Sequence, residues 1–131
     1  MNGLVTIASS YSVVETIDRL VAAVTSRGLT LFARINHAEN AAAQGLQLRP
    51  TELILFGNPK VGTALMQDKQ TSGIDLPVKA LAWQDEGGKV WLTYNDGQWL
   101  KERHNLGENS DSVLRAITDG MRLVTNESTI K

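Results

Sequence analysis

The spacing of apolar and polar residues gives its clearest signal near the start of the chain. Ser12 followed by Glu15 forms a capping box, in which each residue satisfies an amide at the beginning of a helix. Apolar residues then recur at helical spacing, at Val14, Ile17, Val21 and Val24. Gly28 follows Arg27 and suits the left-handed position that ends many helices. These signals together predict a helix over Ser12–Arg27.

The rest of the chain contains five segments with strand character and several shorter helical ones. β-Branched content, alternation or continuous apolar runs predict strands at Gly3–Ser9, Leu29–His37, Thr51–Phe56, Val78–Gln84 and Lys89–Asn95. Short helices are predicted at Ala38–Gly45, Val61–Gln70 and Gly97–His104. A last long helix should begin at Ser110 or Ser112 and run to about Val124, followed by a polar tail, Asn126–Lys131, that is expected to fray.

The last two predicted strands are joined by Asp85-Glu86-Gly87-Gly88, whose paired glycines favour a tight hairpin turn. We expect Gln84 to lie opposite Lys89. Counting from that pair places Lys79 opposite Tyr94 on the inward face of the sheet, and a slip of one residue would exchange the two faces.

Strands, hairpin and helices in this order favour the α+β class, with a mostly antiparallel sheet packed by two long helices. A chain of 131 residues with 42% hydrophobic content is enough for one ordinary domain, and we expect residues 1–131 to form it.

Composition limits the functions that are compatible with the chain. The formal net charge is −1, so no overall field attracts nucleic acid or anionic lipid. The chain contains no cysteine, which excludes disulfides, iron–sulfur clusters and cysteine-ligated zinc and fits a reducing cytoplasm. We find no signal peptide and no apolar run long enough for a membrane helix, and we expect no cofactor.

The segment Thr51–Leu65 has the order strand, glycine–proline turn and helix. Its Gly57-x-x-x-x-Gly62-Thr63 spacing is that of a phosphate-binding loop, but the lysine that should follow Gly62 is absent. Free amides near Gly62 could still hold an anion. We interpret the segment as a scaffold beside the site, with Asn58 near the mouth of a pocket.

Few residues carry candidate chemistry. His37-Ala-Glu39 resembles half of a zinc deaminase signature, whose other half requires cysteines that this chain lacks. No spacing brings the second histidine, His104, to His37, and we expect His104 to be exposed on its helix. Lys79 and Tyr94 could form a pocket floor for a polar or anionic ligand, or Lys79 could lean over Tyr94 at the rim of the sheet.

Several motifs, taken in order along the chain, resemble a bacterial and archaeal family known as domain of unknown function 302. They are Phe32–Ala38, Leu48–Glu52, Phe56–Thr63, Ile74–Leu81 and Tyr94–Asp96. The one departure is Gly97, where family members usually carry proline. The resemblance implies a helix-grip, TATA-binding-protein-like fold, commonly a homodimer, with no established activity. The polar residues of its motifs correspond to His37, Glu52, Asn58, Lys60, Asp75, Lys79, Tyr94 and Asn95.

Three functional hypotheses follow. The first is a dimeric small-ligand or regulatory module with a pocket at the strand ends, lined by His37, Lys79 and Tyr94 with Asn58 at the mouth. The second is an enzyme acting on a small anionic substrate, with His37 as acid/base and Lys79 as electrostatic partner. The third is an interaction domain anchored by Trp91 and Trp99. None of the three includes a metal, a nucleic acid or a membrane.

Overall fold

A computed structural model describes residues 2–131 and shows a five-stranded sheet in the order β1-β5-β4-β3-β2. Every neighbouring pair of strands is antiparallel. The strands are β1 (Leu4–Ser9), β2 (Thr30–Asn36), β3 (Thr51–Gly57), β4 (Val78–Gln84) and β5 (Val90–Asn95). The helices are α1 (Val13–Ser26), α2 (His37–Ala43), α3 (Pro59–Asp68), α4 (Gly97–His104) and α5 (Asp111–Thr129), with short 3-10 turns η1 (Gln70–Asp75) and η2 (Glu108–Ser110). The predicted α+β class is confirmed.

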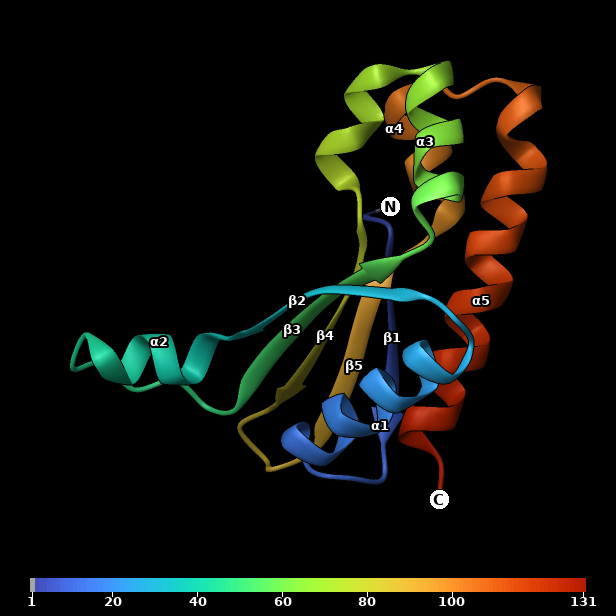
Figure 1. Ribbon diagram of the computed structural model, residues 1–131. Coiled ribbons are helices and arrows are strands. Elements are labelled where there is room, and N and C mark those ends of the chain that lie inside the picture. The colour runs from blue at the N-terminus through green and yellow to red at the C-terminus, as the bar shows by residue number, and fades with distance from the viewer. Residues whose placement is uncertain (1) are drawn as a thin grey trace.

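The two long helices, α1 and α5, cover one face of the sheet, while α3, η1 and α4 gather beyond one end of its strands (Figure 1). The main core lies between the sheet and the two long helices. It contains Ile17 and Leu20 of α1, Ile54 of β3, Leu92 of β5 and Val124 of α5, all with no exposed surface. The first helix begins at the predicted cap, since the Ser12 hydroxyl accepts a hydrogen bond from the amide of Glu15. Among residues 2–131 the reciprocal bond of a capping box, from the Ser12 amide to the Glu15 side chain, does not form.

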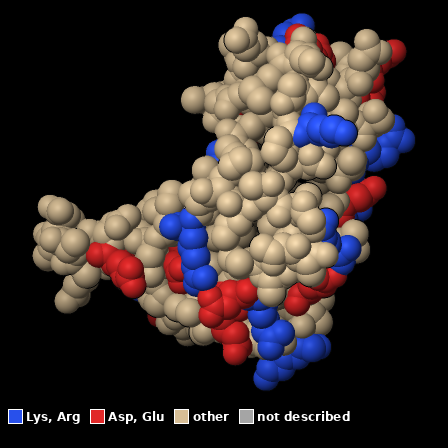
Figure 2. All heavy atoms as spheres, viewed as in Figure 1, with Lys and Arg blue, Asp and Glu red and all other residues tan. Residues whose placement is uncertain are grey.

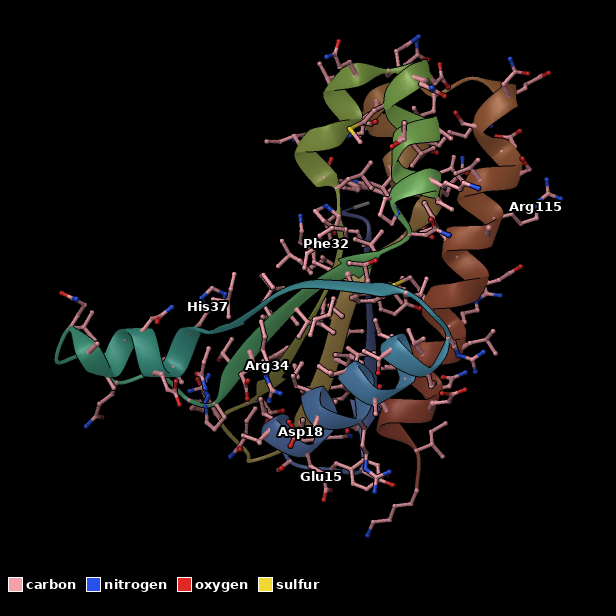
Figure 3. The ribbon with its side chains drawn as sticks, viewed as in Figure 1. Glu15, Asp18, Phe32, Arg34, His37 and Arg115 are labelled. Atoms are coloured by element: carbon pink, nitrogen blue, oxygen red, sulfur yellow. The ribbon has the colours of Figure 1, made fainter. Side chains whose placement is uncertain are left out.

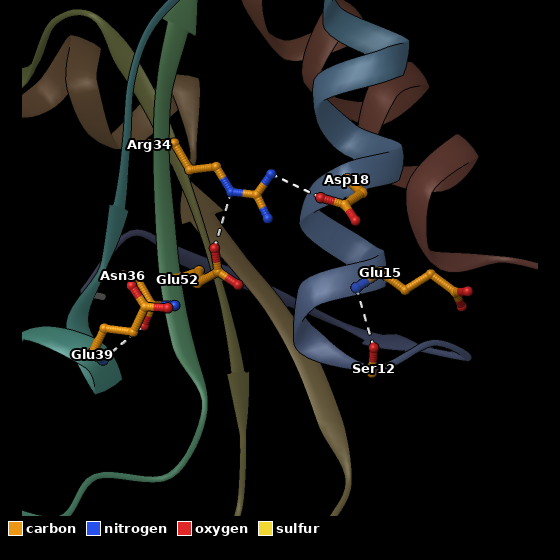
Figure 4. A network of polar contacts seen from close by, with 7 residues as sticks. All are labelled: Ser12, Glu15, Asp18, Arg34, Asn36, Glu39 and Glu52. Carbon is orange, nitrogen blue, oxygen red and sulfur yellow. Dashed lines mark hydrogen bonds and ion pairs between the residues drawn. The ribbon is translucent and has the colours of Figure 1, made fainter. Parts of the chain in front are cut away.

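An ion-pair network fastens α1 to the sheet (Figures 3 and 4). The Arg34 guanidinium on β2 lies 3.0 Å from Glu52 on β3 and 2.8 Å from Asp18 on α1. Glu52 is only 4% exposed, so its carboxylate depends on Arg34 for its charge partner. Burial alone would lower the pKa of Arg34, but the hydrogen bonds with Asp18 and Glu52 outweigh burial and hold that pKa above its ordinary value.

The predicted hairpin register is wrong by one residue. Gln84 pairs with Val90 rather than Lys89, which places Trp83 opposite Trp91 and Ala80 opposite Tyr94. The cause is the Asp85 carboxylate, which accepts hydrogen bonds from the amides of Gly87 and Lys89 and draws Lys89 into the turn. The slip exchanges the faces, so Ala80 and Ala82, and not Leu81 and Trp83, pack beneath the helices.

Two further expectations near the end of the chain are corrected. The polar tail does not fray, because α5 continues to Thr129 and buries Ser128 and Thr129, whose hydroxyls both bond to the carbonyl of Thr125. His104 is not exposed: its side chain is 6% exposed and its Nε2 lies 2.5 Å from Asp75 Oδ2. Ser128 and Thr129 can be buried although they are polar, because their hydroxyls are satisfied by a carbonyl of the same helix.

The connection from β2 to β3 extends away from the body as an arm, residues 37–50, that includes α2 (Figure 1). The Asn36 side chain caps α2 by accepting a hydrogen bond from the amide of Glu39. No side chain of α2 is buried, and two leucines that follow it, Leu46 and Leu48, are 65% and 50% exposed. The arm therefore has almost no contact with the hydrophobic core.

Candidate functional site

A cleft of about 460 Å³ lies at the end of the sheet where α3, η1 and α5 approach the strands. Its floor is formed by Phe56 and Gly57 at the end of β3 and Val78 at the start of β4, and Phe32 of β2 lies at its side. Figure 2 shows the region between α3 and α1 as mostly uncharged surface, with charged groups concentrated elsewhere on that face. The cleft is within the size range of small-molecule sites.

The local sequence explains why β3 ends at this cleft. The apolar run of β3 stops at Gly57, and the Asn58 side chain caps α3 by accepting a hydrogen bond from the amide of Lys60. Pro59 occupies the first position of the helix, where a backbone N–H would have no partner within the helix, so proline loses no hydrogen bond there and the helix starts directly after Asn58. The β2–β3 register shifts between Leu31 and Ala33, and this irregularity places the bulged Phe32, 49% exposed, at the cleft.

Helix α5 forms the opposite wall of the cleft and contributes alanine and glycine to its lining. Ala116 and Gly120 line the cleft together with Ile117 and Met121. A Cβ atom added to Gly120 would have no neighbour within 4 Å. This glycine therefore keeps space open beside the helix, although glycine inside a helix costs about 1 kcal/mol relative to alanine.

The lining contains no ionisable side chain. Its residues are apolar apart from Asn58 and Thr63, both exposed at the rim. Among residues 2–131, neither the Asn58 side-chain NH2 nor the Thr63 hydroxyl makes a hydrogen bond, so both are available to a ligand at the mouth. The cleft can bind an apolar body and offer hydrogen bonds at its rim, but it supplies no acid, base or charged nucleophile.

Two carboxylates fasten the α3–η1 wall of the cleft to the neighbouring segments. Asp68 accepts hydrogen bonds from the Ser110 hydroxyl (2.6 Å) and the Gly107 amide (2.9 Å), and these bonds lower the pKa of Asp68. Asp75 in η1 contacts His104 at 2.5 Å and Arg103 at 3.3 Å, both at the end of α4. The histidine–carboxylate contact therefore joins η1 to the end of α4 behind the cleft wall.

The structure does not bring the four predicted site residues together. Asn58 lines the cleft, whereas His37, Lys79 and Tyr94 do not. Tyr94 packs against the helix-side core, and alternation along β4 places Lys79 on the opposite face of the sheet, so the predicted Lys79–Tyr94 pair does not form.

His37 begins α2 at the base of the arm (Figure 3). The register pairs Asn36 with Glu52 and Glu52 with Ala82, three residues along β4 from Lys79. That separation is roughly 14 Å between the Cα atoms of Asn36 and Lys79, and neither His37 nor Lys79 lines the cleft. Among residues 2–131, no group of three or more ligating side chains is placed to hold a metal ion.

Sequence reasoning assigned the Thr51–Leu65 segment to the scaffold, yet this segment contributes a large share of the cleft lining. It also missed the contribution of α5. The available signal was Gly120, an isolated glycine inside a strong helical pattern, which often has a packing or functional reason.

The fold and the cleft define a two-layer α+β domain with a ligand-sized apolar site at the strand ends. The chain belongs to the family described as "Domain of unknown function DUF302", which matches residues 5–124. The crystal structure of an uncharacterised conserved DUF302 protein from Bacillus stearothermophilus has the same fold. It superimposes with a TM-score of 0.85 at 18% identity, over 98% of this chain and 99% of that one.

Curated relatives share more sequence but are longer. Over 124 residues the chain is 54% identical to a protein of Brucella suis biovar 1 (strain 1330) named "Fluoride-specific ion channel FluC 1", covering 95% of this chain and 49% of that protein. A protein of the same name from Brucella abortus biovar 1 (strain 9-941) matches equally over 46% of its length. The chain spans about half the length of these relatives. Within residues 2–131, no helix has the length and apolar character needed to cross a membrane.

Proposed function

We propose that this domain is a binding module for a small, uncharged and mostly apolar ligand, which occupies the strand-end cleft. The observation that carries the proposal is a cleft of about 460 Å³ whose lining contains no ionisable side chain. Apolar walls with a few polar groups at the mouth are the usual composition of small-molecule sites. Asn58 and Thr63 would orient a polar end of the ligand at the rim.

The cleft supports binding better than catalysis. The enzyme hypothesis required His37 and Lys79 to act on one substrate, and neither residue lines the cleft. A polar or anionic ligand, as first expected, would find no cation among the lining residues to offset its desolvation. An uncharged ligand needs no such partner.

A titration with a neutral hydrophobic fluorophore, N-phenyl-1-naphthylamine, tests the proposal. We expect saturable binding to the wild type and at least about tenfold weaker binding to Gly120→Leu, because the new side chain occupies space that the ligand needs. Arg122→Leu is the matched control, since it adds leucine to an exposed position of the same helix outside the cleft. Equal binding by all three proteins would refute the assignment to the cleft.

We further propose that the domain acts in the cytoplasm as a homodimer. Family resemblance supports the dimer, and the absence of cysteine from the sequence is compatible with a reducing compartment.

A second candidate function comes from the relatives. Because 54% identity extends over 95% of this chain, we propose that the domain assists fluoride export, as an accessory module to a channel such as those for which the relatives are named. Cells that lack the gene for this chain should then tolerate less sodium fluoride than their parent, with unchanged tolerance to sodium chloride. Equal growth of both strains across fluoride concentrations would argue against this role.

A further inference from the structure

One face of the sheet has no helix packed against it, because α1 and α5 both lie on the other face. We call it the open sheet face. Its central side chains alternate with the buried ones along β3, β4 and β5, and all are partly exposed. They are Leu53, Leu55, Leu81, Trp83, Trp91 and Thr93.

The composition of this face differs from that of a sheet surface adapted to water. An antiparallel sheet with one solvated face usually alternates apolar and polar residues, so that polar side chains face water. Here Leu53 and Leu81 are direct cross-strand partners, and Trp83 and Trp91 stack with ring centroids 6.4 Å apart. Lys79 is the one charged residue on the face within these three strands.

The indole and hydroxyl groups of Trp83, Trp91 and Thr93 on the open sheet face already have partners inside the protomer. The Trp83 indole donates to the Thr93 hydroxyl at 2.8 Å, and Thr93 in turn bonds with Thr6 at 2.9 Å. The Trp91 indole donates to Asp85 at 2.9 Å. Covering these indole and hydroxyl groups would therefore leave their donors paired, while the long Lys79 side chain would have to place its ammonium at the edge of the contact.

The arm, residues 37–50, supplies a second surface without a partner. It projects from the body, buries no side chain of α2 and exposes Leu46 and Leu48 (Figure 1). Two exposed leucines on a projecting segment suit a contact with another molecule, because the segment itself is too short to form a core.

We propose that the open sheet face and the arm together form the contact surface of a homodimer, in which two sheets pack face to face and each arm extends over the other copy. This inference rests on the homodimer proposed above. Five strands of about six residues present roughly 500 Å² of sheet, and a stable interface needs about 800 Å² from each partner, so the arm would supply the remainder.

A second copy is the occupant that closes this surface. In a two-fold dimer the same patch is buried on both copies, so no open sheet face remains to continue the assembly. The charged groups on or beside the Trp91 side of this face are the Lys89 ammonium, 4.4 Å from the Trp91 ring centroid, and the Asp85 carboxylate bonded to the Trp91 indole. Charges of both signs are present together with Lys79, so no charge of a single sign requires a different partner.

Sedimentation equilibrium of the wild type, Leu53→Glu and Leu123→Glu tests the proposal. Leu53 lies on the open sheet face, whereas Leu123 is a 51% exposed leucine on α5 and serves as the control. We expect a dimeric wild type, a dimeric Leu123→Glu protein and at least about 30-fold weaker dimerisation of Leu53→Glu, because a carboxylate would be buried in an apolar contact. Circular dichroism confirms that each variant is folded.

The possible outcomes separate the dimer from its contact surface. A monomeric wild-type protein would overturn the homodimer and its contact surface together. A monomeric wild-type protein that sediments with vesicles of anionic lipid would indicate that lipid covers the open sheet face instead. A dimer that persists in Leu53→Glu would overturn only the contact surface.

A cysteine placed on this cysteine-free chain gives an independent test if Leu53→Glu does not fold. Maleimide labelling of Ala8→Cys, on the open sheet face, should slow at least about tenfold when the protein is concentrated above its dimerisation constant, while labelling of Val14→Cys on α1 should not change. A labelling rate of Ala8→Cys that does not change when the protein is concentrated would overturn the proposal.

Discussion

Gly120→Ala is expected to stabilise the protein although it changes a residue of the candidate site. Alanine is favoured over glycine in a helix interior by about 1 kcal/mol, because glycine loses more backbone freedom on folding. Nothing lies within 4 Å of a Cβ atom at this position, so the gain is not opposed by a clash. For a domain of this size, about 1 kcal/mol corresponds to a rise in Tm of roughly 3–5 °C.

The same change at Gly97 should have the opposite sign. Gly97 starts α4 and is buried, and a Cβ atom there would lie 2.5 Å from the Thr118 hydroxyl oxygen and 3.5 Å from the Leu114 carbonyl oxygen. Alanine at this position therefore forces α4 away from α5, at a cost of about 1–3 kcal/mol.

Urea unfolding of the wild type and both variants measures these differences. The reasoning requires an increase in the midpoint for Gly120→Ala, a decrease for Gly97→Ala and unchanged m-values. A loss of stability in Gly120→Ala would mean that the wall of the cleft is closed at this residue, and the ligand-binding proposal would lose its geometric basis.

Two other predictions concern charged groups. Arg34→Met should lower the free energy of unfolding by about 3 kcal/mol, because Glu52 would stay buried without its partner, and Arg34→Met/Glu52→Gln should recover part of that loss in urea unfolding. Full stability in Arg34→Met would contradict this account. The pKa of Asp68 is lowered by the Ser110 hydroxyl and the Gly107 amide, and that of Asp85 by the Trp91 indole and the Lys89 amide, from an ordinary 3.8. The two carboxylates should contribute their full stabilisation above pH 3.8 and lose it as the pH falls through their lowered pKa values. Below pH 3.8 the urea midpoint of Asp68→Asn/Asp85→Asn should therefore vary less with pH than the midpoint of the wild type.

The elements could be predicted from the sequence because their signals are local. The cap at Ser12 and the apolar spacing of α1 lie within a few turns of one helix, and the structure confirms both. The order of these elements already favoured the α+β class before the family resemblance was considered, and the structure shares its fold with the DUF302 protein from Bacillus stearothermophilus.

The hairpin shows how one local error reached the predicted site. The predicted turn contained four residues, Asp85–Gly88, but the Asp85 carboxylate recruits Lys89 as a fifth, and Gln84 pairs with Val90 instead. The resulting slip of one residue separates Lys79 from Tyr94, which now lie on opposite faces of the sheet. Periodicity alone does not fix such a register, because both faces of β4 and β5 carry apolar residues.

The cleft could not be assembled from the sequence because its walls come from distant segments. Phe32, Gly57, Val78 and Gly120 meet only after the sheet and α5 have packed. Glycine and alanine contribute to the cleft by leaving space, and space has no signature in a pattern of apolar and polar residues.

Native mass spectrometry of the protein isolated from its own host tests ligand binding most directly. We predict that wild-type protein retains a small uncharged molecule, and that Gly120→Leu isolated in parallel does not, whereas Arg122→Leu does. Wild-type protein that carries no ligand, or a molecule retained equally by Gly120→Leu, would contradict the assignment of the cleft as the functional site.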